Sequence, residues 1–247
     1  MCLVLLALRA TRDFPLVLAA NRDEFFARPS APASWWRHDG VDVFSGRDLD
    51  KGGTWLGVTR SRRFAVVTNV REGGKPQRPD VGSRGWLVRD ALASAALPPR
   101  IEVEKFPTFN LIVGEGDDVF YLTDDRAPAR VELGVHGLSN HRLDTRWPKV
   151  ERAIAAFEAL GDRVDAAALF HILADDAAAP DDALPRTGVP LEVERALSPP
   201  FVRLPQAAYG TRCSTVVLVD RDGATFFEER TFDERGAPAG TVRQRIV

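Results

Sequence analysis

Short apolar segments at both ends of the chain constrain its fold more than any other feature of the sequence. Residues 2–8 and 14–20 form one pair of such segments, and residues 213–220 and 224–230 form another. A short polar stretch separates the members of each pair, which predicts two β-hairpins. Helical patterns are grouped between the two ends and do not alternate with the strands, so a doubly wound parallel sheet is disfavoured. We therefore expect an α+β fold of two mostly antiparallel sheets with helices outside them.

The middle of the chain adds further elements to this fold. Additional strands are predicted over residues 41–45, 54–59, 64–69, 109–114, 119–123 and 131–134. Helices are predicted over residues 84–97, 147–160 and 166–174, where apolar residues recur at helical spacing. Residues 180–205 contain six of the 17 prolines, so neither a regular helix nor a central strand is expected there. Because no repeat interrupts the pattern, residues 1–247 are expected to form a single domain.

The composition excludes several classes of protein. The net charge of −2 over 247 residues lacks the basic excess of a nucleic-acid-binding protein. The apolar run before Arg9 is far shorter than the roughly twenty residues that span a bilayer, and it has no basic leader. We therefore expect no membrane span and a cytoplasmic location. The 29 arginines against 4 lysines, with abundant alanine, suggest a bacterial source.

Cys2 is the first candidate for chemistry. The chain contains only this cysteine and Cys213, so it has no disulfide framework, and no cysteine or histidine pair has zinc spacing. Removal of Met1 would leave Cys2 with a free α-amine of pKa roughly 7.7–8.0, next to its own thiol. A nucleophile beside its own base is the arrangement of N-terminal-nucleophile enzymes. The alternative is that Cys2 is a small buried residue that begins a core strand.

Polar residues follow the second apolar segment directly, as Asn21-Arg22-Asp23-Glu24. If the first hairpin turns within residues 9–13, residue 2 pairs with a residue between 20 and 22, which brings Cys2 next to Arg22 and Asp23. Asp23 would then orient the amine, and Arg22 would lower the pKa of the thiol or bind an anion. The alternative is a salt-bridged turn at the surface.

Three further candidates lie at the ends of strand-like or turn segments. Asn69 and Asn140 carry amides of the kind that stabilise an oxyanion, although such residues are also common in turns. Arg212 precedes an apolar segment, where it would hold a carboxylate or remain solvated.

Eight motifs together resemble the NRDE family, also called the transport and Golgi organisation 2 family. They are Met1-Cys2, residues 18–25 (LAANRDEF), Arg28-Pro29, residues 52–57 (GGTWLG), Thr68-Asn69, residues 109–112 (FNLI), residues 137–140 (GLSN) and residues 209–212 (YGTR). They extend over most of the chain.

This resemblance implies both a fold and a set of site residues. The family is similar to the cysteine N-terminal-nucleophile hydrolases, which implies a four-layer αββα sandwich and hydrolysis of a non-peptide C–N amide bond. Matched motif by motif, Cys2 resembles the nucleophile and Arg212 the closing arginine. Arg22 and Asp23 resemble the arginine and aspartate of such sites, although their spacing differs, and Asn69 and Asn140 resemble the amide residues.

The same resemblance implies an alternative function. Eukaryotic members of the family are linked to haem trafficking and to lipid or acyl-CoA homeostasis, so a non-catalytic carrier on the same scaffold is the second hypothesis. Haem or a lipid would be its ligand, but no axial-ligand motif for haem can be assigned because His136 and His141 lie outside the shared motifs. The hydrolase would need no cofactor and would have a small-molecule substrate as its partner.

Overall fold

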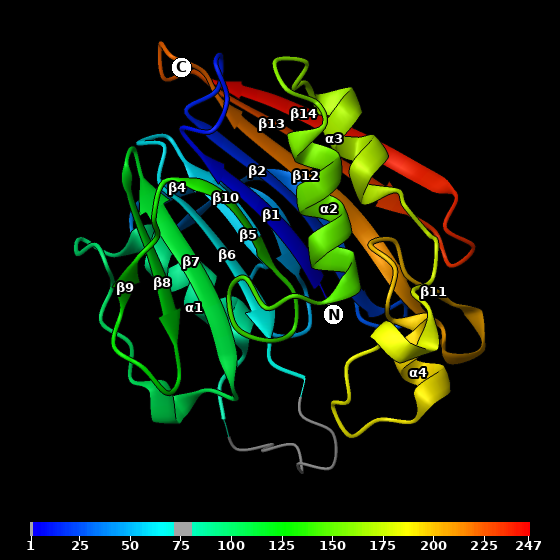
Figure 1. Cartoon of the computed structure of the whole chain (residues 1–247). Coiled ribbons are helices and arrows are strands. Elements are labelled where there is room, and N and C mark those ends of the chain that lie inside the picture. Colours follow the sequence, from blue (N-terminus) through cyan, green and yellow to red (C-terminus); the bar gives the residue numbers. More distant parts are fainter. Residues whose placement is uncertain (1, 72–80) are drawn as a thin grey trace. The chain divides into compact units, whose positions relative to one another are not determined.

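The computed structural model describes residues 2–71 and 81–247, which divide into two compact units. Unit 1 comprises the described residues 2–27, 71 and 133–245, and unit 2 comprises 28–70, 81–132 and 246–247. Each unit is built on one seven-stranded sheet (Figure 1). The single domain expected over the whole chain stays a prediction.

The sheet of unit 1 contains both hairpins predicted from the ends of the chain. Its strand order is β10-β1-β2-β12-β13-β14, and β11 pairs with β12. The bounds of its strands are β1 Cys2–Leu8, β2 Leu16–Phe25, β10 Gly134–Leu138, β11 Arg203–Leu204, β12 Tyr209–Val219, β13 Thr225–Phe232 and β14 Pro238–Ile246. β1 pairs antiparallel with β2, and β12 pairs antiparallel with both β2 and β13. The N-terminal hairpin, β1–β2, and the C-terminal hairpin, β12–β13, therefore lie side by side in one sheet.

Two helices cover one face of this sheet (Figure 1). They are α2 Pro148–Glu158 and α3 Ala166–Leu173, and both were predicted from their apolar spacing. Leu3 and Leu5 of β1 are fully buried in the cluster that the helices form with the sheet. Side chains alternate between the faces of a strand, so the odd-numbered residues of β1 point toward the helices.

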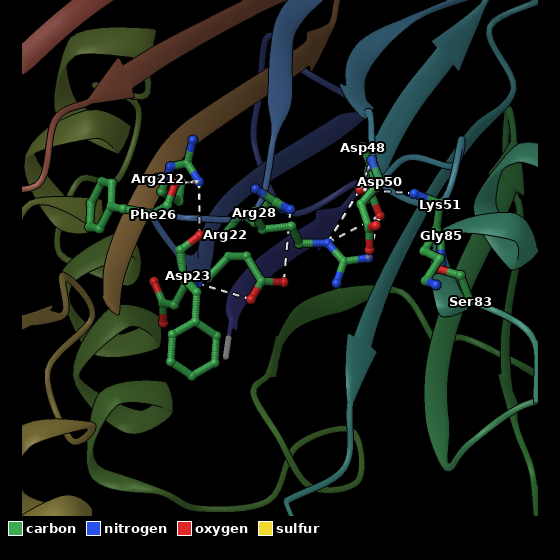
Figure 2. Close-up of polar contacts among 12 residues, drawn as sticks. Arg22, Asp23, Phe26, Arg28, Asp48, Asp50, Lys51, Ser83, Gly85 and Arg212 are labelled. Carbon is green, nitrogen blue, oxygen red and sulfur yellow. Dashed lines mark hydrogen bonds and ion pairs between the residues drawn. The ribbon is translucent and has the colours of Figure 1, made fainter. Parts of the chain in front are cut away.

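The sheet of unit 2 has the strand order β3-β4-β5-β6-β7-β8-β9. The bounds of its elements are β3 Ser30–His38, β4 Val41–Asp48, β5 Leu56–Thr59, β6 Phe64–Asn69, α1 Arg84–Ala93, β7 Phe109–Glu115, β8 Asp118–Thr123 and β9 Ala129–Arg130. α1 packs on one face through Leu87, Val88 and Leu92. Arg28 anchors the start of the unit, because its Nη2 lies 2.6 Å from Asp48 Oδ2 (Figure 2).

Several sequence-based boundaries were wrong. β2 continues to Phe25, so Asn21 lies within a strand, where the carbonyls of Leu173 and Pro200 accept hydrogen bonds from its amide. A strand was not expected over β3, which contains Pro32; the strand is an edge strand with a register shift there, and proline is tolerated in such a place.

The remaining differences lie in the second half of the chain. A short helix, α4 Leu191–Ala196, forms within residues 180–205, where none was expected. Pro190 directly precedes it, and proline is compatible with the start of a helix. β14 was also not predicted, and no strand forms over residues 131–133, which lie between β9 and β10.

The predicted fold class is confirmed: the chain is an α+β protein with two antiparallel sheets and helices on one face of each. No helix among the described residues has both the length and the apolar character needed to cross a membrane.

Candidate functional site

Cys2 is the first residue of β1 and lies at the open end of the hairpin that β1 forms with β2. It is half-buried and pairs directly with Arg22 of β2, as the hairpin register predicted. Residues opposite each other in an antiparallel pair project to the same face, so the thiol and the guanidinium share one face of the sheet. This face is opposite to the one covered by α2 and α3.

Asn140 and Ser139 hold the backbone of Cys2. The backbone nitrogen of Cys2 donates a hydrogen bond to Asn140 Oδ1 at 3.3 Å, and Ser139 Oγ donates to the Cys2 carbonyl at 2.9 Å. Both residues directly follow β10, which pairs with β1. The motif at residues 137–140 therefore fixes the nitrogen and the carbonyl of Cys2 at the same time.

The surroundings of the Cys2 thiol act on its pKa in opposite directions. Burial raises the pKa above its ordinary value, and the Asp23 carboxylate acts in the same direction. A hydrogen bond from the Asp23 backbone and the positive charge of Arg22 lower it, but they do not outweigh burial. The thiol is therefore protonated at neutral pH and needs a base before it can attack a substrate.

Asp23 is a buried carboxyl group beside Cys2. Thr211 Oγ1 donates to its Oδ1 at 2.7 Å, and the Tyr209 hydroxyl donates to its carbonyl at 3.0 Å. Burial raises the pKa of Asp23, whereas the charges of Lys149 and Arg22 and the Thr211 hydrogen bond lower it. The motif at residues 209–212 thus supplies two hydroxyl groups that fix this aspartate.

Arg212 lies next to Arg22 (Figure 2). It occupies the point where the pairing of β12 with β2 shifts register, and such a bulge redirects a side chain. Its Nη1 donates to the carbonyl of Phe25 at 2.9 Å, and its guanidinium lies 5.0 Å from the centre of the Phe26 ring. Arg22 itself lies 3.9 Å from the carboxylate of Glu24. The two arginines therefore form a positively charged group at this end of the sheet.

The sixth predicted residue, Asn69, belongs to unit 2. It ends β6, where its backbone pairs with Phe109 of β7. Its role beside Cys2 stays a prediction. Five of the six candidates, Cys2, Arg22, Asp23, Asn140 and Arg212, lie together in unit 1.

Sequence reasoning missed several residues of this region. Ser139 and Thr211 stand inside motifs that were noticed, but only the asparagine and the arginine of those motifs were assigned roles. Lys149 was not considered, although a lysine between Trp147 and Val150 at the start of an apolar helix is unusual, and lysine is scarce in this chain. Its side chain is 1% exposed. Buried lysines of this kind are rare unless they are paired.

Cys213, the second cysteine of the chain, is a buried packing residue. It is buried opposite Arg22 on β12, and burial, with the nearby Glu229 carboxylate, raises its pKa well above the ordinary value. Arg22 therefore pairs with Cys2 on one side and with Cys213 on the other. No group of three or more metal-ligating side chains occurs among residues 2–71 and 81–247.

The sequence matches a known family over almost its whole length. The profile of the family described as "Transport and Golgi organisation 2" matches residues 1–234. The Transport and Golgi organization protein 2 homolog of Homo sapiens is 34% identical over 250 residues, which cover 90% of this chain and 88% of the human protein.

Solved structures share the fold at low sequence identity. An N-acylethanolamine-hydrolyzing acid amidase ortholog from Caenorhabditis elegans is similar with a TM-score of 0.51 and 13% identity, over 88% of this chain and 92% of its own. The C2A mutant of conjugated bile acid hydrolase from Clostridium perfringens is similar with a TM-score of 0.50 and 10% identity, over 99% and 96% of the two chains. These similarities establish the N-terminal-nucleophile-hydrolase type of fold, as the motifs predicted.

Proposed function

The chain belongs to the Transport and Golgi organisation 2 family, and we propose that it is an N-terminal-cysteine hydrolase of a non-peptide C–N amide bond. The observation that carries this proposal is the hydrogen bond from the Cys2 nitrogen to Asn140 Oδ1. After removal of Met1, that nitrogen is a free α-amine held next to its own thiol. Two proteins of the same fold are named for hydrolysis, one of an N-acylethanolamine and one of conjugated bile acids.

The amine is suited to act as the base of the reaction. Burial keeps the Cys2 thiol protonated at neutral pH, so it needs a proton acceptor within reach. An α-amine has a pKa of roughly 7.7–8.0, close to the optimum for general base catalysis at neutral pH. Asn140 Oδ1 accepts one amine hydrogen, which orients the nitrogen lone pair independently of the substrate.

The reaction would proceed through a thioester. The amine takes the thiol proton as Sγ attacks the substrate carbonyl, which forms the C–S bond and a tetrahedral oxyanion. Collapse of this intermediate breaks the C–N bond, and the ammonium returns the proton to the leaving amine. Water then attacks the thioester, with the α-amine again as the base, and releases the acid and the free thiol.

The other candidates would support these steps from fixed positions. Asp23, held by Thr211, would stabilise the ammonium form of the amine. Arg22 stabilises negative charge on the sulfur by electrostatic interaction. The oxyanion would be bound by Asn69, by the side-chain nitrogen of Asn140 or by a backbone N–H group.

Mass spectrometry of the purified protein tests this function. The intact mass should correspond to loss of Met1, and incubation with a panel of N-acyl amides should add the mass of an acyl group to Cys2. Cys2→Ala should abolish both this adduct and product release, while the Ala variant should keep its thermal unfolding temperature. An active protein that retains Met1 would disprove the mechanism, because the nitrogen would be part of a peptide bond.

The remaining expectations from the sequence stay proposals. We propose a small-molecule substrate, no cofactor and no nucleic-acid partner, with a cytoplasmic location in a bacterium. The haem or lipid carrier stays the alternative, and haemin titration of wild-type and Cys2→Ala protein would test it through the Soret band.

A further inference from the structure

Two buried cations near Cys2 have no part in the mechanism described above. Lys149 is the second residue of α2, and Arg71 is 8% exposed. The backbone N–H of Arg71 donates to the carbonyl of Asn140 at 2.7 Å, so this arginine is attached to the residue that holds the Cys2 nitrogen. Lys149 interacts electrostatically with Asp23, Arg71 and Cys2. Arg71 is therefore attached to the residue that orients Cys2, and Lys149 lies at the start of α2, on the side of the sheet toward which Asp23 points.

Each of these cations has a hydrogen-bond donor that is not used. Among residues 2–71 and 81–247, Lys149 Nζ and Arg71 Nε are buried and have no hydrogen-bond acceptor. Arg71 Nη1 lies 2.8 Å from Glu194 Oε2, and the other oxygen of Glu194 accepts from the backbone and the hydroxyl of Thr187. The Glu194 carboxylate thus neutralises one edge of the guanidinium and leaves its Nε unsatisfied. Buried donors without acceptors are uncommon in folded proteins because each of them costs free energy.

The start of α2 adds positive potential at the same place. Arg71 lies over the Trp147 ring, 4.5 Å from its centre, and Trp147 directly precedes α2. No side chain in the described part of the chain caps this helix, and the N-terminus of a helix attracts anions. Lys149 and Arg71 also repel each other, and burial lowers the pKa of both. A bound anion would relieve the repulsion and would satisfy both donors.

We propose that Arg71 and Lys149, at the start of α2, form an anion-binding subsite beside Cys2 that receives a substrate carboxylate. The inference rests on the proposed function, and it specifies the substrate as an N-acyl amino acid. In such a compound the carboxylate oxygens lie within about 5 Å of the scissile carbonyl carbon, as standard bond lengths require. The backbone of Arg71 is bonded to Asn140, and the side chain of Asn140 holds the nitrogen of Cys2, so the subsite lies next to the residue whose sulfur attacks the carbonyl.

Equilibrium binding to the full-length Cys2→Ala protein tests this subsite without turnover. The probes are N-acylglycines with acetyl, hexanoyl and decanoyl chains, each compared with the N-acylglycinamide of the same chain. We expect at least one acylglycine to bind, and to bind at least tenfold more tightly than its uncharged amide. Lys149→Met should abolish this preference, Lys149→Arg should keep part of it, and Lys105→Met, which removes an exposed lysine, should leave it unchanged.

The possible results separate this inference from the proposed function. Equal affinity for an acylglycine and its amide, binding of neither, or a preference that survives in Lys149→Met would overturn the subsite. The proposed function fails on a different measurement, namely if wild-type protein forms no acyl-thioester with any amide, charged or neutral. Unfolding temperatures of the variants exclude misfolding as the cause of a lost preference.

Discussion

The backbone nitrogen of Cys2 donates a hydrogen bond to Asn140 Oδ1 across 3.3 Å. The two residues are 138 positions apart in sequence, and the pairing of β1 with β10 brings them together. A single amide thus determines where the proposed base lies relative to the proposed nucleophile.

Replacing Asn140 by alanine is expected to lower kcat about 100-fold, within the range that general base catalysis contributes. The reason is that the amine loses the acceptor that orients it, while the thiol keeps its environment. Steady-state kinetics over a range of pH measures the effect. Asn140→Asp should shift the acidic limb of the profile to higher pH, because a carboxylate beside the amine favours its protonated form.

Ser139→Ala is the matched control for this prediction. Ser139 Oγ donates to the carbonyl of Cys2 at 2.9 Å, and its contact with Asn140 Oδ1 is longer, at 3.4 Å. Its loss leaves the acceptor of the Cys2 nitrogen in place, so it should lower the free energy of unfolding by about 1 kcal/mol and leave the pH profile unchanged. Equal kinetic effects of the two changes would show that Asn140 acts only by holding the chain.

Lys149→Met is expected to raise the free energy of unfolding at pH 7 by about 1–3 kcal/mol, because it removes a buried donor that has no acceptor. Chemical denaturation measures this change, and Lys105→Met, at an exposed site, should stay within about 0.5 kcal/mol of wild type. A variant less stable than wild type would instead show that Lys149 forms a stabilising native ion pair.

The same variant makes a prediction about pH. Burial lowers the pKa of Lys149, so below the ordinary lysine pKa of about 10.4 the unfolded chain binds more protons than the folded one. The free energy of unfolding of wild type therefore increases, through the titration of Lys149, as the pH rises toward that value. The advantage of Lys149→Met should shrink over the same range.

Cys213 is expected to make the protein sensitive to alkaline pH. Its folded-state pKa is raised well above the ordinary value, so its contribution is complete below the unfolded pKa of about 8.5 and is lost as the pH rises further. The free energy of unfolding of Cys213→Ala should therefore approach that of wild type between pH 8 and 10. A constant difference between the two proteins would contradict this assignment.

Local patterns in the sequence were sufficient to predict the first hairpin and to limit the partner of residue 2 to residues 20–22. The apolar segments on either side of a short turn allow few pairings, and one of them places Cys2 opposite Arg22, as observed. The strand character of Asn21 was not predictable in this way, because its acceptors, the carbonyls of Leu173 and Pro200, come from distant parts of the chain.

The candidate site was predicted only in part for a similar reason. Motifs identify residues that are unusual in type, such as Cys2 at the second position. They do not reveal burial, and burial is what distinguishes Lys149 from a solvated lysine at the start of a helix. The acceptor or ligand that a buried charge requires becomes visible only when the neighbouring elements are in place.

Gly53 is expected to tolerate no side chain, which explains the second glycine of the motif at residues 52–57. A Cβ at Gly53 would lie 2.5 Å from the carbonyl carbon of Gly85 at the start of α1, and the backbone of Thr54 donates to the Gly85 carbonyl at 3.1 Å. Because the obstacle is backbone, it cannot rotate away.

Gly53→Ala should therefore lower the free energy of unfolding by about 1–3 kcal/mol, as overpacking does. Gly116→Ala in the same unit is the control, since its positive φ costs about 1–2 kcal/mol and no atom lies within 4 Å of the added Cβ. If Gly53→Ala costs no more than this control in chemical denaturation, the close approach of the loop to α1 is not what requires glycine there.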